Sequence, residues 1–86
     1  MTDAGAPDTV LWQVIKPDRT ITCRRRAIRA GRGWDDYVGL ELRVDHNGQV
    51  FRTEIHTDHV TFVHRVEELR RMLEAEGWML TEATRP

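Results

Sequence analysis

Arginine side chains dominate one segment of this 86-residue chain. Residues 16–32 carry seven basic side chains and one acid, whereas the rest of the chain carries six bases and thirteen acids, so a net charge of -1 hides a strong asymmetry. Such a basic segment is typical of a strand or loop that meets an anion, most often nucleic acid. Two simpler explanations stay open. The segment docks on the acidic helix of this protein or of a second copy, or the excess of Arg over Lys reflects a GC-rich coding sequence.

An aromatic ring accompanies these arginines. Trp34 follows Arg29 and Arg32 in a glycine-containing loop, and aromatic rings interleaved with Arg provide stacking and phosphate neutralisation for single-stranded nucleic acid. The alternative is that Trp34 folds back as a lid over the edge of a sheet. The candidate nucleic-acid-binding residues are Arg24, Arg26, Arg29, Arg32 and Trp34.

The other reactive residues do not form a catalytic constellation. The chain contains no serine, and Cys23 lies in a predicted strand where adjacent side chains point to opposite faces, so we expect a buried structural thiol. The neighbouring carboxylates Asp35 and Asp36 have no partner base that the sequence identifies. A glycine-rich phosphate loop and a nucleotide fingerprint are both missing from the sequence. We therefore expect a protein that is not an enzyme and has no cofactor.

Four histidines between positions 46 and 64 raise the question of a metal site. His59 and His64 lie about 140° apart around a helix, whereas two ligands on one helical face need a spacing of three or four residues. His46 adjoins a hairpin turn at the far end of a strand from His56. We therefore predict ordinary surface and helix-start histidines, although the sequence leaves open whether His56, Asp58 and His59 together bind a metal.

Two hairpins are expected to carry the basic segment and the sheet. The segments 10–16 and 20–29 are rich in β-forming residues and flank the turn-forming pair Pro17-Asp18. A second pair of strands, 37–45 with strict apolar and polar alternation and 49–56, flanks Asn47-Gly48, which suits a type I′ turn.

The Asn47-Gly48 turn also predicts a register for the second hairpin. With His46 opposite Gln49, the apolar residues of both strands share one face, and a slip by one residue would turn them outward. The expected pairs are Val44 with Phe51, Leu42 with Thr53, Leu40 with Ile55, Arg43 with Arg52, and Glu41 with Glu54.

A helix should follow from about Asp58, where the apolar period changes to that of one helical face. Asp58 or Thr61 can cap its start, Gly77 can end it, and 78–81 is apolar enough for a short last strand. The apolar stripe consists of Phe62, Val66, Leu69 and Leu73. The sequence therefore predicts an α+β fold: a two-layer antiparallel sheet of four to five strands, in the order of four strands, one helix and one strand, with the helix on one face.

The domain organisation and location follow from composition. We expect a disordered N-terminal tail at 1–9, a single α+β domain at 10–83 and a frayed C-terminus at 84–86. A single cysteine and an acidic N-terminal segment without signal-peptide features favour the cytoplasm. The apolar runs are far shorter than the roughly 20 residues needed to span a bilayer, so no membrane partner is expected.

Two hypotheses for function remain from the sequence. The first is a small non-enzymatic binding module for single-stranded nucleic acid, and the alternative is a protein-protein interaction or regulatory module that associates through its sheet face or an edge strand. One helix leaves one sheet face uncovered, and the first strand must send either Leu11 and Ile15 or Val10, Trp12 and Val14 to that face. An apolar patch there predicts a homodimer, formed through these side chains or by edge pairing of strands.

Overall fold

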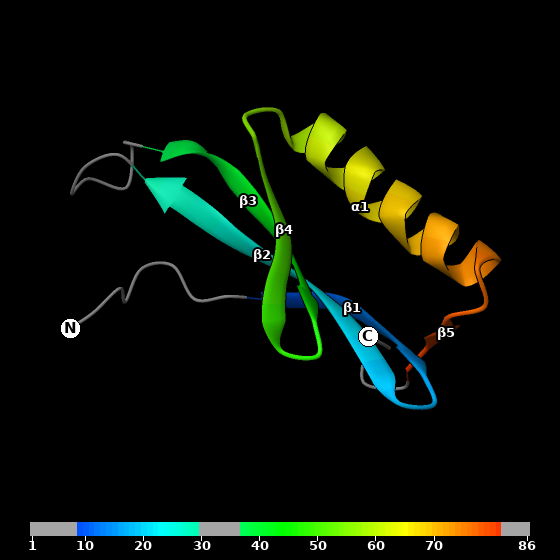
Figure 1. The fold of residues 1–86 in the computed structure, drawn as a ribbon. Helices are drawn as coiled ribbons and strands as arrows, with labels where there is room; N and C mark the ends of the chain where they lie inside the picture. The colour runs from blue at the N-terminus through cyan, green and yellow to red at the C-terminus, as the bar shows by residue number, and fades with distance from the viewer. Residues whose placement is uncertain (1–8, 30–36, 82–86) are drawn as a thin grey trace.

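The residues that the structure describes form a single antiparallel sheet with one helix across one of its faces (Figure 1). The computed structural model describes residues 9–29 and 37–81. Within these ranges, five strands lie in the spatial order β4-β3-β2-β1-β5. The elements are β1 (Thr9–Lys16), β2 (Arg19–Arg29), β3 (Tyr37–His46), β4 (Gln49–His56), α1 (His59–Ala75) and β5 (Met79–Leu80). The predicted two-layer α+β architecture is confirmed.

Helix α1 begins and ends at the predicted residues. The carboxylate of Asp58 accepts hydrogen bonds from the backbone N–H of Thr61 at 2.9 Å and from its hydroxyl at 2.7 Å, which caps the N-terminus. Gly77, with a φ of +98°, reverses the chain after the helix, and the N–H of Trp78 donates to the carbonyl of Leu73. In the described ranges, no helix has the length and apolar character needed to cross a membrane.

The core lies between the helix and the sheet. Trp12, Val14, Cys23 and Leu42 are each at most 2% exposed, and the predicted helical stripe packs against them. The indole N–H of Trp12 donates to the carbonyl of Val66 at 3.2 Å, which ties β1 to α1. Burial raises the pKa of the Cys23 thiol to about 12, so this cysteine is a structural residue, as expected. The buried residues are Trp12, Val14, Ile21, Cys23, Leu40, Leu42, Val44, Phe62, Val66, Leu69 and Trp78.

The turn of the second hairpin was predicted correctly, but the register beyond it was wrong. Asn47 and Gly48 both have positive φ, at 53° and 86°, and His46 pairs with Gln49 as expected. A β-bulge then inserts Phe51, so that each residue of β3 pairs one position further along β4. The observed pairs are Val44 with Arg52, Arg43 with Thr53, Leu42 with Glu54, Glu41 with Ile55, and Leu40 with His56.

The bulge places polar residues of β4 on the helix side of the sheet, where the sequence had predicted Thr53 and Ile55. Glu54 lies beside buried Leu42, and Ile55 is 59% exposed on the opposite face. The apolar faces of the two strands therefore do not coincide. One extra residue reverses the side to which every later side chain points, because the side-chain period of a strand is two.

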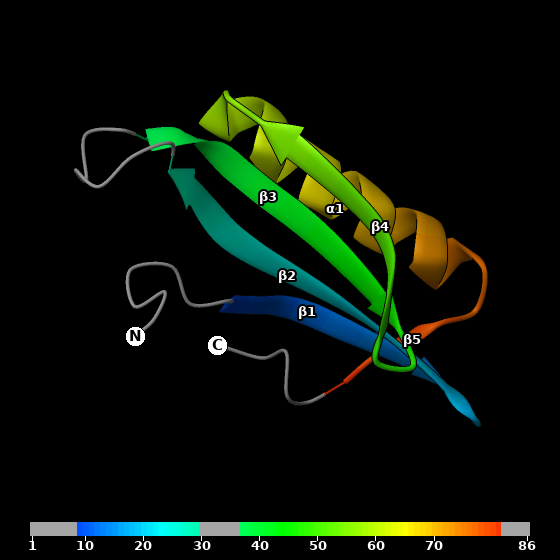
Figure 2. The same ribbon diagram turned by 60° about the vertical axis from the view of Figure 1, so that its left-hand side comes forward.

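Strand β1 also contains a bulge, and neither predicted distribution of its side chains is correct. The register shifts between Val10 and Trp12, so Trp12 and Val14 face the helix and Leu11 packs against the same core. Val10 and Ile15 point to the other face, where they are 50% and 41% exposed. We call this face, turned away from α1, the open face; within the described part of the chain no element covers it (Figure 2).

Candidate nucleic-acid interface on the open face

Three arginines gather at the centre of the open face. Cys23 of β2 and Val44 of β3 are buried against the helix, and strand alternation therefore turns their neighbours to the open side. The residues that share this position are Arg24 and Arg26 on β2 and Glu41, Arg43 and Asp45 on β3, which we call the arginine cluster.

Two carboxylates hold the guanidinium groups of the cluster. Nε of Arg24 lies 2.9 Å from Oδ2 of Asp45, and Nη2 of Arg26 lies 3.2 Å from Oε1 of Glu41. The same Glu41 oxygen is 3.6 Å from Nη2 of Arg43. The basic segment is thus partly neutralised by acids of the protein itself, and these acids lie on the neighbouring strand and not on the helix.

The carboxylates lie deeper than the arginines. The side chains of Asp45 and Glu41 are 9% and 13% exposed, whereas those of Arg24 and Arg26 are 36% and 39% exposed. The cluster therefore has partly exposed guanidinium side chains above recessed acids.

Two arginines of the cluster face each other across the β2–β3 ladder. Arg24 stands directly opposite Arg43 in the β2–β3 ladder, and like charges in this position destabilise a sheet. Among the described residues, Asp45 lies close to Arg24, and Glu41 lies close to Arg26 and Arg43, which offsets part of this repulsion. An anion above Arg24 and Arg43 would reduce this repulsion, because it would lie within reach of both cations.

Only some of the five predicted binding residues are seen on the open face among the residues that the structure describes. Arg24 and Arg26 lie together on the open face, and Arg29 is the last residue of β2. Arg32 and Trp34 lie outside the described residues. Arg43 was missed by the sequence analysis, which had paired it with Arg52; the strict alternation of β3 already indicated that it points away from the apolar face.

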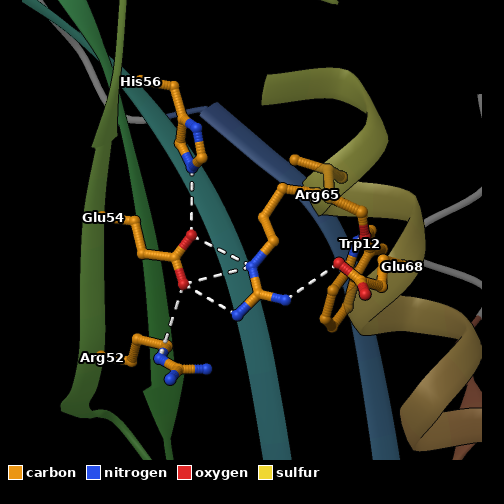
Figure 3. A network of polar contacts seen from close by, with 7 residues as sticks. Trp12, Arg52, Glu54, His56, Arg65 and Glu68 are labelled. Atoms are coloured by element: carbon orange, nitrogen blue, oxygen red, sulfur yellow. Dashed lines mark hydrogen bonds and ion pairs between the residues drawn. The ribbon is translucent and has the colours of Figure 1, made fainter. Parts of the chain in front are cut away.

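A second network of arginines and carboxylates lies on the helix side of the sheet (Figure 3). Glu54 of β4 accepts bidentate hydrogen bonds from the guanidinium of Arg65 of α1. Nε lies 3.1 Å from Oε1 and Nη2 lies 2.9 Å from Oε2. His56 and Arg52 approach the same carboxylate, with Nε2 and Nε at 3.0 Å and 3.6 Å. Arg65 also donates to Glu68 on its own helix at 3.0 Å. We call these residues the helix-side network.

Electrostatics show that Glu54 is the centre of this network. The hydrogen bond from Arg65 is the main cause that lowers the pKa of Glu54, with contributions from His56 and Arg52. The same contact raises the pKa of Arg65. Because Arg65 joins β4 to α1 through its contact with Glu54, we assign the network to the attachment of the helix and not to ligand binding.

The histidines do not converge on one point. His56 contacts Glu54, and Asp58 is the helix cap. Among the residues that the structure describes, no three side chains of His, Cys, Asp or Glu come together in a way that could hold a metal ion.

Comparison of the chain with protein-family models, with curated proteins and with solved structures gives no significant match. The functional argument therefore rests on the geometry of the open face.

Proposed function

We propose that this protein is a small non-enzymatic module that binds single-stranded nucleic acid on the open face of its sheet. The observation that carries the proposal is the central position of Arg24, Arg26 and Arg43, whose side chains are more exposed than the two carboxylates that contact them. Phosphate oxygens accept hydrogen bonds from guanidinium groups, and phosphate contacts supply most of the affinity of proteins for nucleic acid.

The surroundings of the arginine cluster favour an extended, single-stranded ligand. Arg24 and Arg26 follow one another along β2 at a spacing of about 7 Å, so a row of phosphates can run along the strand. Val10 and Ile55 are exposed on the same face, on either side of the cluster. Apolar side chains can contact the faces of bases, which a single strand exposes and a duplex hides.

The second candidate function is a protein-interaction module that uses the same face. Its support is the exposure of Ile15 and Met79, which are paired neighbours on β1 and β5 and are 41% and 69% exposed. Protein interfaces are usually apolar at the centre and polar at the rim. The open face has the reverse arrangement, with charges at its centre and apolar residues at its margins, which is why nucleic acid is the first proposal.

Fluorescence anisotropy with a labelled single-stranded DNA at several salt concentrations tests the proposed function. Three phosphate contacts predict that log affinity falls with log salt at a slope of about -2, since each single-strand contact contributes about -0.7. The double variant Arg24→Gln, Arg26→Gln should reduce the magnitude of this slope by about 1.4.

The matched control removes the same charge from the helix. The double variant Arg70→Gln, Arg71→Gln also loses two positive charges, but from residues of α1, and it should leave the slope unchanged. If both double variants reduced the magnitude of the salt slope equally, the effect would come from net charge and not from the position of the arginines on the open face. No binding at low salt would reject the nucleic-acid proposal and leave the protein-interaction module.

A further inference from the structure

An apolar groove follows the seam between the C-terminal half of α1 and the tip of the β3–β4 hairpin. Two adjoining hollows, of about 280 and 240 Å³, form it and share Ile21, Phe51, Leu73 and Glu76 as lining residues. Val44, Arg52, Leu69 and Met72 complete the lining of the larger hollow. We call this feature the seam groove; it lies on the helix side of the sheet, away from the arginine cluster.

The bulge in β4 explains why Phe51 borders the groove. Phe51 is the extra residue of the bulge, and a bulge re-aims the side chain that it inserts. The ring stands edge-on to His46, with centroids 6.3 Å apart, and yet its side chain is 68% exposed. Met72, on the opposite wall, is 51% exposed. A protruding aromatic ring thus stands directly beside a hollow with apolar walls.

We propose that a second copy of this chain docks in the seam groove, with the Phe51 ring of each copy inserted into the groove of the other. A twofold axis requires a surface that is complementary to itself, and a ring beside a hollow meets this requirement. The charges at the rim agree with it. Arg52 and Glu76 line the larger hollow together, so a twofold axis can bring each Arg52 close to the partner's Glu76.

This interface differs from the one that the first strand predicts. α1 already covers Trp12 and Val14, and the apolar residues that β1 leaves on the open face are separated from Ile55 by the arginine cluster. The seam groove combines a mainly apolar lining with an exposed aromatic ring, which is typical of an interface centre. The proposal is independent of the nucleic-acid proposal, since docking at the seam leaves the open faces of both copies accessible.

Light scattering and sedimentation over concentrations from about 1 µM to about 1 mM test the proposal. We expect the mass of the chain at the low end and twice that mass at the high end. Phe51→Asp should weaken the dimer at least about thirtyfold, because a ring at the centre of an interface is a hot spot. Phe51 is largely exposed, so circular dichroism should show an unchanged fold.

Ile55→Asp is the matched control. Ile55 lies on the same strand and is 59% exposed, but it points to the open face. Its substitution should leave the dissociation constant of the dimer within about twofold, because surface changes outside an interface have small effects. A monomer mass at all concentrations would overturn the proposal, and so would a dimer that Phe51→Asp does not weaken or that Ile55→Asp weakens equally.

Discussion

Arginines and carboxylates meet twice in this protein, and the two networks are built in opposite ways. In the helix-side network, one carboxylate, Glu54, is the centre and Arg65 closes on it from another layer of the fold. In the arginine cluster on the open face, the carboxylates Glu41 and Asp45 lie beneath the guanidinium groups and are less exposed than the arginine side chains. The first network joins the two layers of the fold, and the second lies within the sheet with its arginine side chains partly exposed.

An ion pair does not by itself reveal the role of an arginine. What differs is which partner is more exposed. Arg65 and Glu54 are buried to a similar degree, at 24% and 22% exposure, so each satisfies the other. Arg24 is 36% exposed above an Asp45 that is 9% exposed, so its outer edge still faces solvent. The following predictions separate an attachment role from a binding role.

The largest effect is expected from removal of the centre of the helix-side network. Glu54→Ala leaves the half-buried guanidinium of Arg65 without its main acceptor, and we expect a loss of about 2 kcal/mol in the free energy of unfolding. Urea denaturation measures it. Glu68→Ala removes the other acceptor of Arg65, which is 59% exposed, and should cost less than about 0.5 kcal/mol. Equal losses in the two variants would contradict the central role of Glu54.

The second largest loss of stability is expected from a substitution in the turn that positions Glu54. Gly48→Val forces a φ of 86° on a β-branched residue, which should cost at least about 1 kcal/mol. Thermal unfolding of the variant measures this loss. An unchanged melting temperature would show that Asn47 and Gly48 do not hold the hairpin in the described register.

The contribution of the Glu54 carboxylate should also appear in the pH dependence of stability. The pKa of Glu54 in the folded protein lies below its ordinary value of 4.5, mainly because Arg65 donates to the carboxylate. Its contribution is therefore complete above about pH 4.5 and is lost as the pH falls through the lowered folded pKa. Melting temperatures from about pH 7 to about pH 3 should fall less steeply for Glu54→Gln than for the natural chain. If the melting temperatures of the two proteins fell in parallel with pH, the ionisation of Glu54 would not contribute to stability.

The smallest effect on stability is expected on the open face. Arg26→Ala removes an exposed guanidinium and leaves Arg43 near Glu41, so the free energy of unfolding should change by less than about 0.5 kcal/mol. Its affinity for single-stranded DNA should nevertheless fall, with a decrease of about 0.7 in the magnitude of the salt slope. A loss of stability as large as that of Glu54→Ala would place Arg26 among the attachment residues.

The order and type of the elements could be predicted from the sequence because local signals specify them. Alternation predicted β3, the Asn47-Gly48 pair predicted the turn, and the spacing of Phe62 and Leu69 predicted α1. The β4 register could not be predicted, since the turn fixes only the first pair and the bulge at Phe51 has no local signature.

The candidate site was predicted in part for the same reason. Charge density along one strand identified Arg24 and Arg26. Arg43 comes from a neighbouring strand, and its position opposite Arg24 depends on the β2–β3 register. The Glu54–Arg65 contact joins a strand to a helix, and no periodicity in the sequence connects two residues in different layers.

Titration of the protein with single-stranded oligothymidylate, followed through the arginine Nη–H signals by NMR, shows which guanidinium groups contact the DNA. The signals of Arg24, Arg26 and Arg43 should shift on addition of the DNA, whereas that of Arg65 should stay in place because its donors are already engaged by Glu54 and Glu68. Unchanged signals of the three open-face arginines, or equal shifts at Arg65, would contradict the assignment of binding to the open face.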